Sequence, residues 1–321
     1  MMDKNKDKEE TKKTTHQMIS ESEIWAGLNR PDLILDEVDI AVMGIPFDEG
    51  VSFRNGAKEA PNALRAITYT IPPTTEHFES LVGLKVKDFG DVNDEERDYM
   101  FGAAETLVSE FVKTGTFFTM IGGDHSTTIP VLKGIDKALN EPFGIIHIDA
   151  HFDLCDALDD DKLSHGSVER RALELENVPD SESIFFIGTR SIEEDELEFM
   201  NNNKLNVINA HKFNQRGVEH VLQLVKEKMD RFDKIYLTID IDCLDPGYAA
   251  GTGTPQFGGL SSRALLDLLL GLFELPIIGF DVVEVAPKLD PSLTSLFAAR
   301  KIITECWGHQ YRKMLNKPLK L

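Results

Sequence analysis

The chain has 321 residues, of which 41% are hydrophobic, and its 34 basic against 55 acidic residues give a formal charge of −21. A chain of this length and composition can bury a sizeable core, in one large domain or two average ones. A surface this acidic argues against nucleic-acid or anionic-membrane binding, because both partners would be repelled, and it is compatible with a small cationic substrate.

The first twenty residues are polar and of mixed charge, without the apolar core of a signal peptide, so we expect a loose tail at residues 1–20. No stretch is long and apolar enough to span a membrane, because the run 264–280 is interrupted by Asp267, Glu274 and Pro276. The three cysteines are sparse and match no disulfide pattern. They indicate reduced thiols and a cytoplasmic location.

Apolar runs typical of strands alternate with stretches of helical period from residue 38 onward. Strands are predicted at residues 38–44, 86–89, 117–122, 143–149, 183–188, 206–209, 234–240 and 277–283. Helices are predicted at residues 95–113, 126–139, 167–175, 193–202, 217–231, 261–273 and 293–308. This alternation predicts a mostly parallel sheet with helices on both faces. No linker divides the chain, so residues 21–321 are expected to form one domain.

Acids and histidines follow four of these predicted strands. The strand ends are occupied by Gly122-Gly123-Asp124-His125-Ser126, Asp149-Ala150-His151-Phe152-Asp153, Asp240-Ile241-Asp242 and Glu284. Ligands of open α/β sheets bind at the carboxyl ends of the strands, so we expect these side chains to share one site. If strand geometry persists, Asp149, His151 and Asp153 point one way, and so do Asp240 and Asp242.

The composition of this candidate site points to metal. Four carboxylates in one buried place repel one another unless cations or protons are present. Imidazole and carboxylate ligands without thiolate suit hard or borderline ions such as Mn²⁺, and the number of acids suggests two ions. Cys155 and Cys243 are interpreted as packing residues, His147 as a buried neighbour of the ligands, and Arg190 as structural.

In these motifs the chain resembles the ureohydrolase superfamily, which includes arginase, agmatinase, guanidinobutyrase and formimidoylglutamase. Further matching segments are Ser164-His165-Gly166, Gly251-Thr252-Gly253-Thr254-Pro255 and Asp281-Val282-Val283-Glu284-Val285-Ala286-Pro287. The resemblance covers about residues 38–307. It implies a three-layer α/β/α sandwich with a mostly parallel central sheet, and two Mn²⁺ ions per chain held by His125, Asp149, His151, Asp153, Asp240 and Asp242.

The resemblance also implies a role for each residue. Asp149 and Asp240 would bridge the ions, with Asp153 joining the His125 ion and Asp242 the His151 ion. The ions would activate a water that attacks the guanidinium carbon, while Asp153 accepts a hydrogen bond from it. His165 would pass a proton to the leaving amine, and Glu284 would bind the guanidinium. A homotrimer or homohexamer is implied as well.

The loop after Asp153 favours agmatine as the substrate. Arginase usually holds the substrate carboxylate there with Asn-Thr-Pro, whereas this chain has Leu154-Cys155-Asp156-Ala157-Leu158, followed by Asp159, Asp160 and Asp161. Such a loop disfavours a carboxylate and tolerates a distal ammonium, so Asp156 is predicted to bind the substrate. The resemblance implies Glu284 and His165 as the other substrate-binding residues. The alternatives are guanidinobutyrase, formimidoylglutamase, which often carries the Phe152 seen here, and a metal-binding regulatory relative without catalysis.

Overall fold

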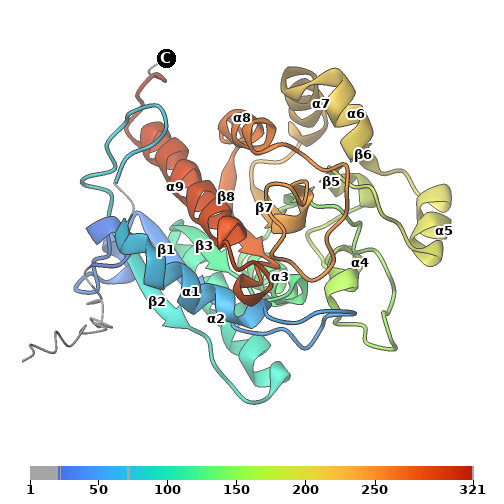
Figure 1. The fold of residues 1–321 in the computed structure, drawn as a ribbon, viewed down its shortest axis with the longest axis horizontal. Helices are drawn as coiled ribbons and strands as arrows, with labels where there is room; N and C mark the ends of the chain where they lie inside the picture. The colour runs from blue at the N-terminus through green and yellow to red at the C-terminus, as the bar shows by residue number, and fades with distance from the viewer. Residues whose placement is uncertain (1–20, 22, 71–72, 320–321) are drawn as a thin grey trace, which may run out of the picture.

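A single parallel sheet forms the centre of the structure, a computed structural model that describes residues 21, 23–70 and 73–319. Its order is β2-β1-β3-β8-β7-β4-β5-β6, and every neighbouring pair is parallel (Figure 1). The strands are β1 (Ile40–Gly44), β2 (Val86–Asp91), β3 (Phe117–Ile121), β4 (Gly144–Ile148), β5 (Ile184–Ile187), β6 (Asn206–Ile208), β7 (Ile235–Asp240) and β8 (Ile277–Val283).

Helices cover both faces of the sheet. One layer consists of α1 (Ala60–Ile67), α9 (Thr294–Met314), α8 (Ser262–Leu272), α7 (Val218–Met229) and α6 (Ala210–Arg216), which contact one another in that order. The other contains α2 (Arg97–Thr114), α3 (Thr128–Ala138) and α4 (Val168–Ala172), and α5 (Glu194–Asn202) follows β5. In β1, Ile40 and Val42 pack into one core, and Ala41 and Met43 into the other. The predicted three-layer α/β/α sandwich is confirmed.

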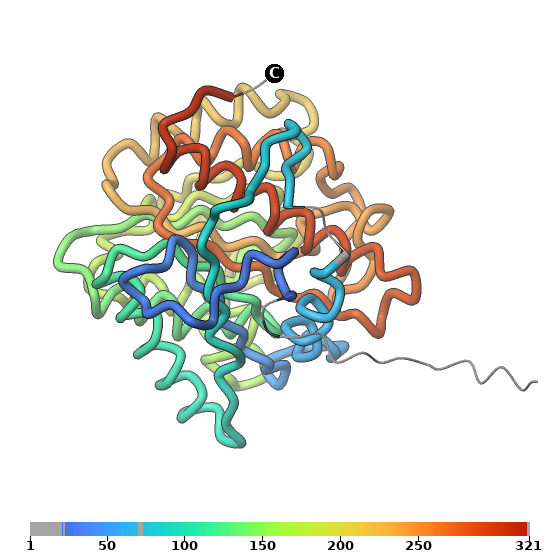
Figure 2. Tube along the Cα trace, turned by 90° about the vertical axis from the view of Figure 1, so that its left-hand side faces the viewer, coloured from blue at the N-terminus to red at the C-terminus, as the bar shows by residue number. Residues whose placement is uncertain are grey.

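Two short helices were not predicted from the sequence. Helix α1 has 8 residues, with a proline in its first turn, and α6 has 7 residues between the Asn209 cap and Gly217. Helix α9 also runs past its predicted end at Gly308. At Gly308 the absence of a side chain lets the segment 73–84 pack against α9, which it crosses in Figure 2, since a Cβ there would come within 2.1 Å of Thr75 Cγ2.

Within the part of the chain that the structure describes, no helix has both the length and the apolar character needed to cross a membrane. The predicted tail, residues 1–20, lies outside the described residues. The assignment of residues 21–321 to one domain stays a prediction.

Candidate metal centre

The four strands that precede the candidate residues are consecutive in the sheet. Their order, β3-β8-β7-β4, brings their carboxyl ends together at the middle of one edge. After β3, Gly123 passes so close to the chain at Phe47 that a Cβ would lie 1.6 Å from the Phe47 carbonyl oxygen. Asp124 then caps the short 3-10 turn His125–Thr127 by accepting the Ser126 N–H. His125 is thereby directed into the site.

Strand geometry does not persist through the other candidate residues. Strand β4 ends at Ile148, and Asp242 lies in a 3-10 turn, Ile241–Cys243, after β7. Asp153 and Glu284 have left-handed backbones, with φ of 54° and 61°. The expected sharing of strand faces is therefore wrong as an explanation. Turns bring these side chains together, and the strained φ values are of the kind that cluster at functional sites.

His125 faces three carboxylates. Its Nδ1 lies 2.9 Å from Asp149 Oδ2, 2.9 Å from Asp153 Oδ2 and 3.5 Å from Asp240 Oδ2. On the opposite side of the ring, Nε2 lies 2.8 Å from Thr238 Oγ1, and the Thr238 hydroxyl donates to Asp281. Because the threonine proton is used in that bond, Nε2 of His125 must be the donor to Thr238. Nδ1 is then left with a lone pair directed at the carboxylates.

His151 faces a second group of carboxylates. Its Nδ1 lies 3.1 Å from Asp242 Oδ2 and 3.4 Å from Asp149 Oδ1. One potential ligand atom from each of Asp149, His151 and Asp242 lies within 4.8 Å of the others. The two oxygens of Asp149 therefore point to two different histidines, an arrangement that suits a bridging carboxylate.

The buried atoms of this cluster fit a metal better than they fit one another. His125 Nδ1, Asp149 Oδ2 and Asp242 Oδ2 are buried and have no hydrogen-bond partner, even though His125 Nδ1 and Asp149 Oδ2 are only 2.9 Å apart. Their close approach lacks the alignment of a hydrogen bond. Buried polar atoms without partners are costly, and lone pairs that converge without bonding to each other are expected of ligands to a shared cation.

The ionisation of the cluster points the same way. Burial opposes the charge on Asp149, but the imidazoles of His125, His147 and His151 beside it hold its pKa well below the usual range. Burial and the charges of Asp242 and Asp149 raise the pKa of Asp240 well above its usual range, and burial and Asp149 raise that of Asp242. The carboxylates cannot all ionise together without added positive charge, which two divalent ions would supply.

His147 lies behind the cluster. It stacks on His125 with ring centroids 5.2 Å apart, and its Nδ1 lies 2.9 Å from Glu169 Oε1. Its Nε2 is 3.3 Å from both Asp149 Oδ2 and the His151 carbonyl oxygen. His125, His147 and Asp149 also come close enough together to hold an ion. Since both nitrogens of His147 already face acceptors, orientation of Asp149 is the role that fits its contacts.

His165 connects two other parts of the site. Its Nδ1 is 3.0 Å from Glu284 Oε1, and its Nε2 is 3.0 Å from Ser52 Oγ. Glu284 Oε1 also accepts the His125 N–H, at 3.0 Å, so Glu284 ties the proton-shuttle candidate to a ligand candidate. Glu284 is 2% exposed, and it lies behind His165 rather than in the lining of the cavity.

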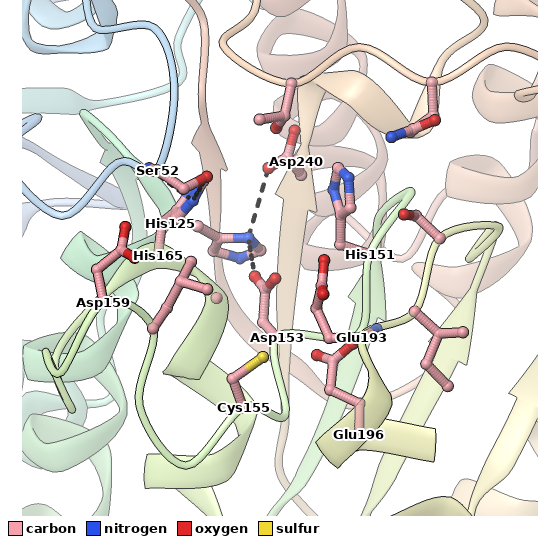
Figure 3. A pocket seen from close by; sticks show the side chains of 16 residues that line it. Ser52, His125, His151, Asp153, Cys155, Asp159, His165, Glu193, Glu196 and Asp240 are labelled. Atoms are coloured by element: carbon pink, nitrogen blue, oxygen red, sulfur yellow. Dashed lines mark hydrogen bonds and ion pairs between the residues drawn. The ribbon is translucent and has the colours of Figure 1, made fainter.

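A cavity of about 320 Å³ opens onto this cluster (Figure 3). Figure 3 shows Glu193 on the His151 side of the cavity and Asp159 on the His165 side. The lining residues are Ser52, His125, His151, Asp153, Cys155, Leu158, Asp159, His165, Gly166, Ser191, Ile192, Glu193, Glu196, Asp240, Thr254 and Gln256. Burial and the charge of Asp153 raise the pKa of Glu196 to about 7, although hydrogen bonds from the backbone N–H groups of Glu193 and Leu154 act in the opposite direction.

Sequence reasoning missed Ser52, Glu193 and Glu196 as lining residues. Glu193 and Glu196 form the capping box at the start of α5, so their spacing indicated only a helix start. Conversely, the structure does not place the predicted substrate residue Asp156 in the cavity lining. Its side chain is 54% exposed and pairs with Arg171 at 2.8 Å and Lys162 at 3.4 Å. Asp156 therefore lies outside the cavity lining, and its charge is balanced by Arg171 and Lys162.

Comparisons with known proteins agree with the geometry. The sequence profile of the arginase family matches residues 38–308. The chain is 35% identical to an agmatinase from Chromobacterium violaceum over 277 residues, covering 84% of this chain and 82% of the relative. It is 33% identical to a guanidinobutyrase from Pseudomonas aeruginosa over 276 residues, covering 83% and 84%. The crystal structure of a hypothetical agmatinase from Burkholderia thailandensis superposes with a TM-score of 0.78 at 30% identity, covering 91% of each chain. The chain therefore belongs to the arginase family and is a hydrolytic ureohydrolase of guanidino compounds.

Proposed function

We propose that the chain hydrolyses agmatine to putrescine and urea at a centre of two Mn²⁺ ions. The composition of the cavity carries the choice of substrate. Among the described residues that line it, none is a lysine or arginine, whereas Asp159, Glu193 and Glu196 add carboxyl groups beyond the proposed ligands. An alkylammonium would find partners there, and a terminal carboxylate would meet mainly negative charge. Similarity alone does not decide, because an agmatinase and a guanidinobutyrase are almost equally similar.

The two groups of contacts give most of the proposed ligands. His125, Asp149, Asp153 and Asp240 would hold one ion, and His151, Asp149 and Asp242 the other. That Asp240 also joins the second ion is proposed from the family resemblance. When bound, the ions would lower the pKa of a water and so supply a nucleophile at neutral pH. Asp153 is proposed to accept a hydrogen bond from that water. Its left-handed backbone, at φ 54°, and its contact with His125 give the carboxylate a fixed direction.

His165 is the proposed proton donor to the leaving amine. Burial opposes its charge, but the hydrogen bond and negative charge of Glu284 raise its pKa to about 9, which favours the protonated imidazole that a proton donor needs. Because Glu284 lies behind His165, its proposed role toward the guanidinium is exerted through its negative charge, which attracts a cation to that end of the cavity. Assembly as a homotrimer or homohexamer and a cytoplasmic location also stay predictions.

A substrate panel tests the reaction class. Mn²⁺-loaded protein would be offered agmatine, arginine, guanidinobutyrate, formimidoylglutamate and guanidine, and the products of each would be measured. We expect urea, with agmatine giving the highest kcat/KM. A preference for formimidoylglutamate would move the chain to another reaction, and no turnover of any compound would favour the regulatory alternative.

Neutralising the cavity acids should change the choice of substrate. In an Asp159→Asn, Glu193→Gln variant we expect kcat/KM for agmatine to fall and that for guanidinobutyrate to hold or rise. The ratio should drop by about tenfold, because both side chains are exposed and such charge pairs contribute ~0–1 kcal/mol each. The control is Asp160→Asn, Glu194→Gln, which changes the net charge equally at neighbouring exposed positions outside the lining. Equal ratios in both variants would refute the role of the lining acids.

A further inference from the structure

Arg190, which follows β5, binds a set of backbone carbonyls beside the proposed metal centre. Its Nη2 donates to the carbonyl oxygens of Asp242 at 2.7 Å, Gln256 at 2.8 Å and Leu244 at 3.3 Å. Its Nη1 donates to Gly188 at 3.1 Å and Cys243 at 3.4 Å, and its Nε donates to Gln256 at 3.3 Å. No carboxylate of the described residues forms an ion pair with it, so its donors are committed to the backbone.

These contacts join two loops that carry proposed ligands. The backbone N–H groups of Arg190 and Ser191 donate to the Ala150 carbonyl, at 2.7 and 3.0 Å. The Ala150 N–H in turn donates to Asp242 Oδ1 at 3.1 Å. Since the guanidinium binds the Asp242 carbonyl, the residues Arg190, Ala150 and Asp242 form a closed ring of hydrogen bonds. Ala150 lies between the proposed ligands Asp149 and His151. The ring therefore connects the segment that carries these two ligands to the turn that carries Asp242.

An arginine is required for this arrangement. The planar guanidinium has five N–H donors in a fixed fork and can reach carbonyls on several sides, whereas a lysine ammonium is a point donor on a flexible stem. The chain at Gly259 also packs closely against the guanidinium of Arg190. A Cβ on Gly259 would lie 2.7 Å from Arg190 Nη2 and 2.5 Å from the Asp245 nitrogen.

We propose that Arg190 is a positioning residue that locks the Asp242 turn against the Ala150 loop and so sets His151 and Asp242, the two proposed ligands that serve only one of the two ions. This inference rests on the proposed two-ion centre. The pocket around His125 and Asp153 lies outside the hydrogen-bonded ring. Loss of the guanidinium should therefore weaken the binding of one ion and leave the binding of the other unchanged. A general loss of stability would affect both.

The test compares metal binding by the metal-free full-length protein and its variants. Arg190→Lys keeps the charge but loses the fork. Arg54→Lys is the matched control, because Arg54 also donates to backbone carbonyls near the cavity, those of Thr252 and Gly253 at 3.0 Å, on a segment without proposed ligands. Asp242→Asn and His125→Asn provide the reference patterns for weakening each ion. Bound Mn²⁺ would be measured by equilibrium dialysis, and EPR would distinguish coupled from isolated ions.

We expect two ions in the wild type and in Arg54→Lys. In Arg190→Lys one ion should bind normally and the other about 10- to 100-fold more weakly, with the pattern of Asp242→Asn. Wild-type affinity for both ions, or equal weakening of both, would overturn the role of Arg190. A wild type that binds fewer than two ions would instead refute the proposed centre. If Arg190→Lys does not fold, the same measurement on Arg190→Gln, which also removes the fork, should show weaker binding of the same ion.

Discussion

Asp149→Asn is expected to release both metal ions and to lower hydrolysis by at least about 10³-fold. The two oxygens of Asp149 face different histidines, His125 at 2.9 Å and His151 at 3.4 Å, so one substitution deprives both pockets of charge. A metal ion contributes several kcal/mol to transition-state stabilisation, and about 1.4 kcal/mol corresponds to tenfold in rate. Asp240→Asn should behave similarly if it also bridges. Elemental analysis and urea release measure the two effects.

The control for this substitution is Asp290→Asn. Asp290 is also a buried aspartate, but its carboxylate accepts hydrogen bonds from Ser292 and Ser295 at the start of α9, away from the cluster. We expect this variant to keep two ions, although its stability can fall. If Asp149→Asn kept both ions and its activity, Asp149 would not be a bridging ligand.

His165→Ala should lower kcat by about 10²–10⁴-fold while leaving the metal content unchanged, which is the typical contribution of a general acid or base. His165 has contacts with Glu284 and Ser52 and lines the cavity, but it has no direct contact with the proposed ligand side chains. Steady-state kinetics at neutral pH and elemental analysis on the same preparation check both parts of this expectation.

His165→Asn separates proton donation from shape. Asparagine can keep a hydrogen bond to Glu284, but it cannot donate a proton as an acid at neutral pH. We therefore expect Asn to be as slow as Ala, and added imidazole to restore part of the activity of the Ala variant. A His165→Asn enzyme with wild-type kcat would show that His165 only holds the loop.

The sequence predicted the strands of the site better than the path of the chain after them. The apolar runs gave β3, β4, β7 and β8 nearly to the residue, because buried parallel strands are marked by continuous hydrophobicity. Their adjacency depends on pairings between distant segments, which no local pattern records. The left-handed backbone conformations of Asp153 and Glu284 could not be predicted either, because an aspartate or glutamate after a strand gives no sign of a positive φ.

Tertiary contacts decided which acids line the cavity. From the sequence, Asp156 was expected to bind the substrate, but in the structure it forms ion pairs with Arg171 and Lys162. Glu193 and Glu196 had a complete local explanation as a helix start, so nothing in the sequence pointed to a further role. The residue pattern at the strand ends, together with the family resemblance, thus pointed to the proposed ligands, whereas the residues that line the cavity could be found only from the fold.

Competition between agmatine and guanidinobutyrate tests the proposed function most directly. The two compounds share the guanidinium and differ chiefly in an ammonium or a carboxylate at the other end. The Mn²⁺-loaded protein would receive both at equal concentration, and the ratio of putrescine to aminobutyrate would give the ratio of kcat/KM. We predict an excess of putrescine, because the described cavity lining contains acids and no lysine or arginine. An excess of aminobutyrate would contradict the proposed substrate, and the membership of the arginase family would stand.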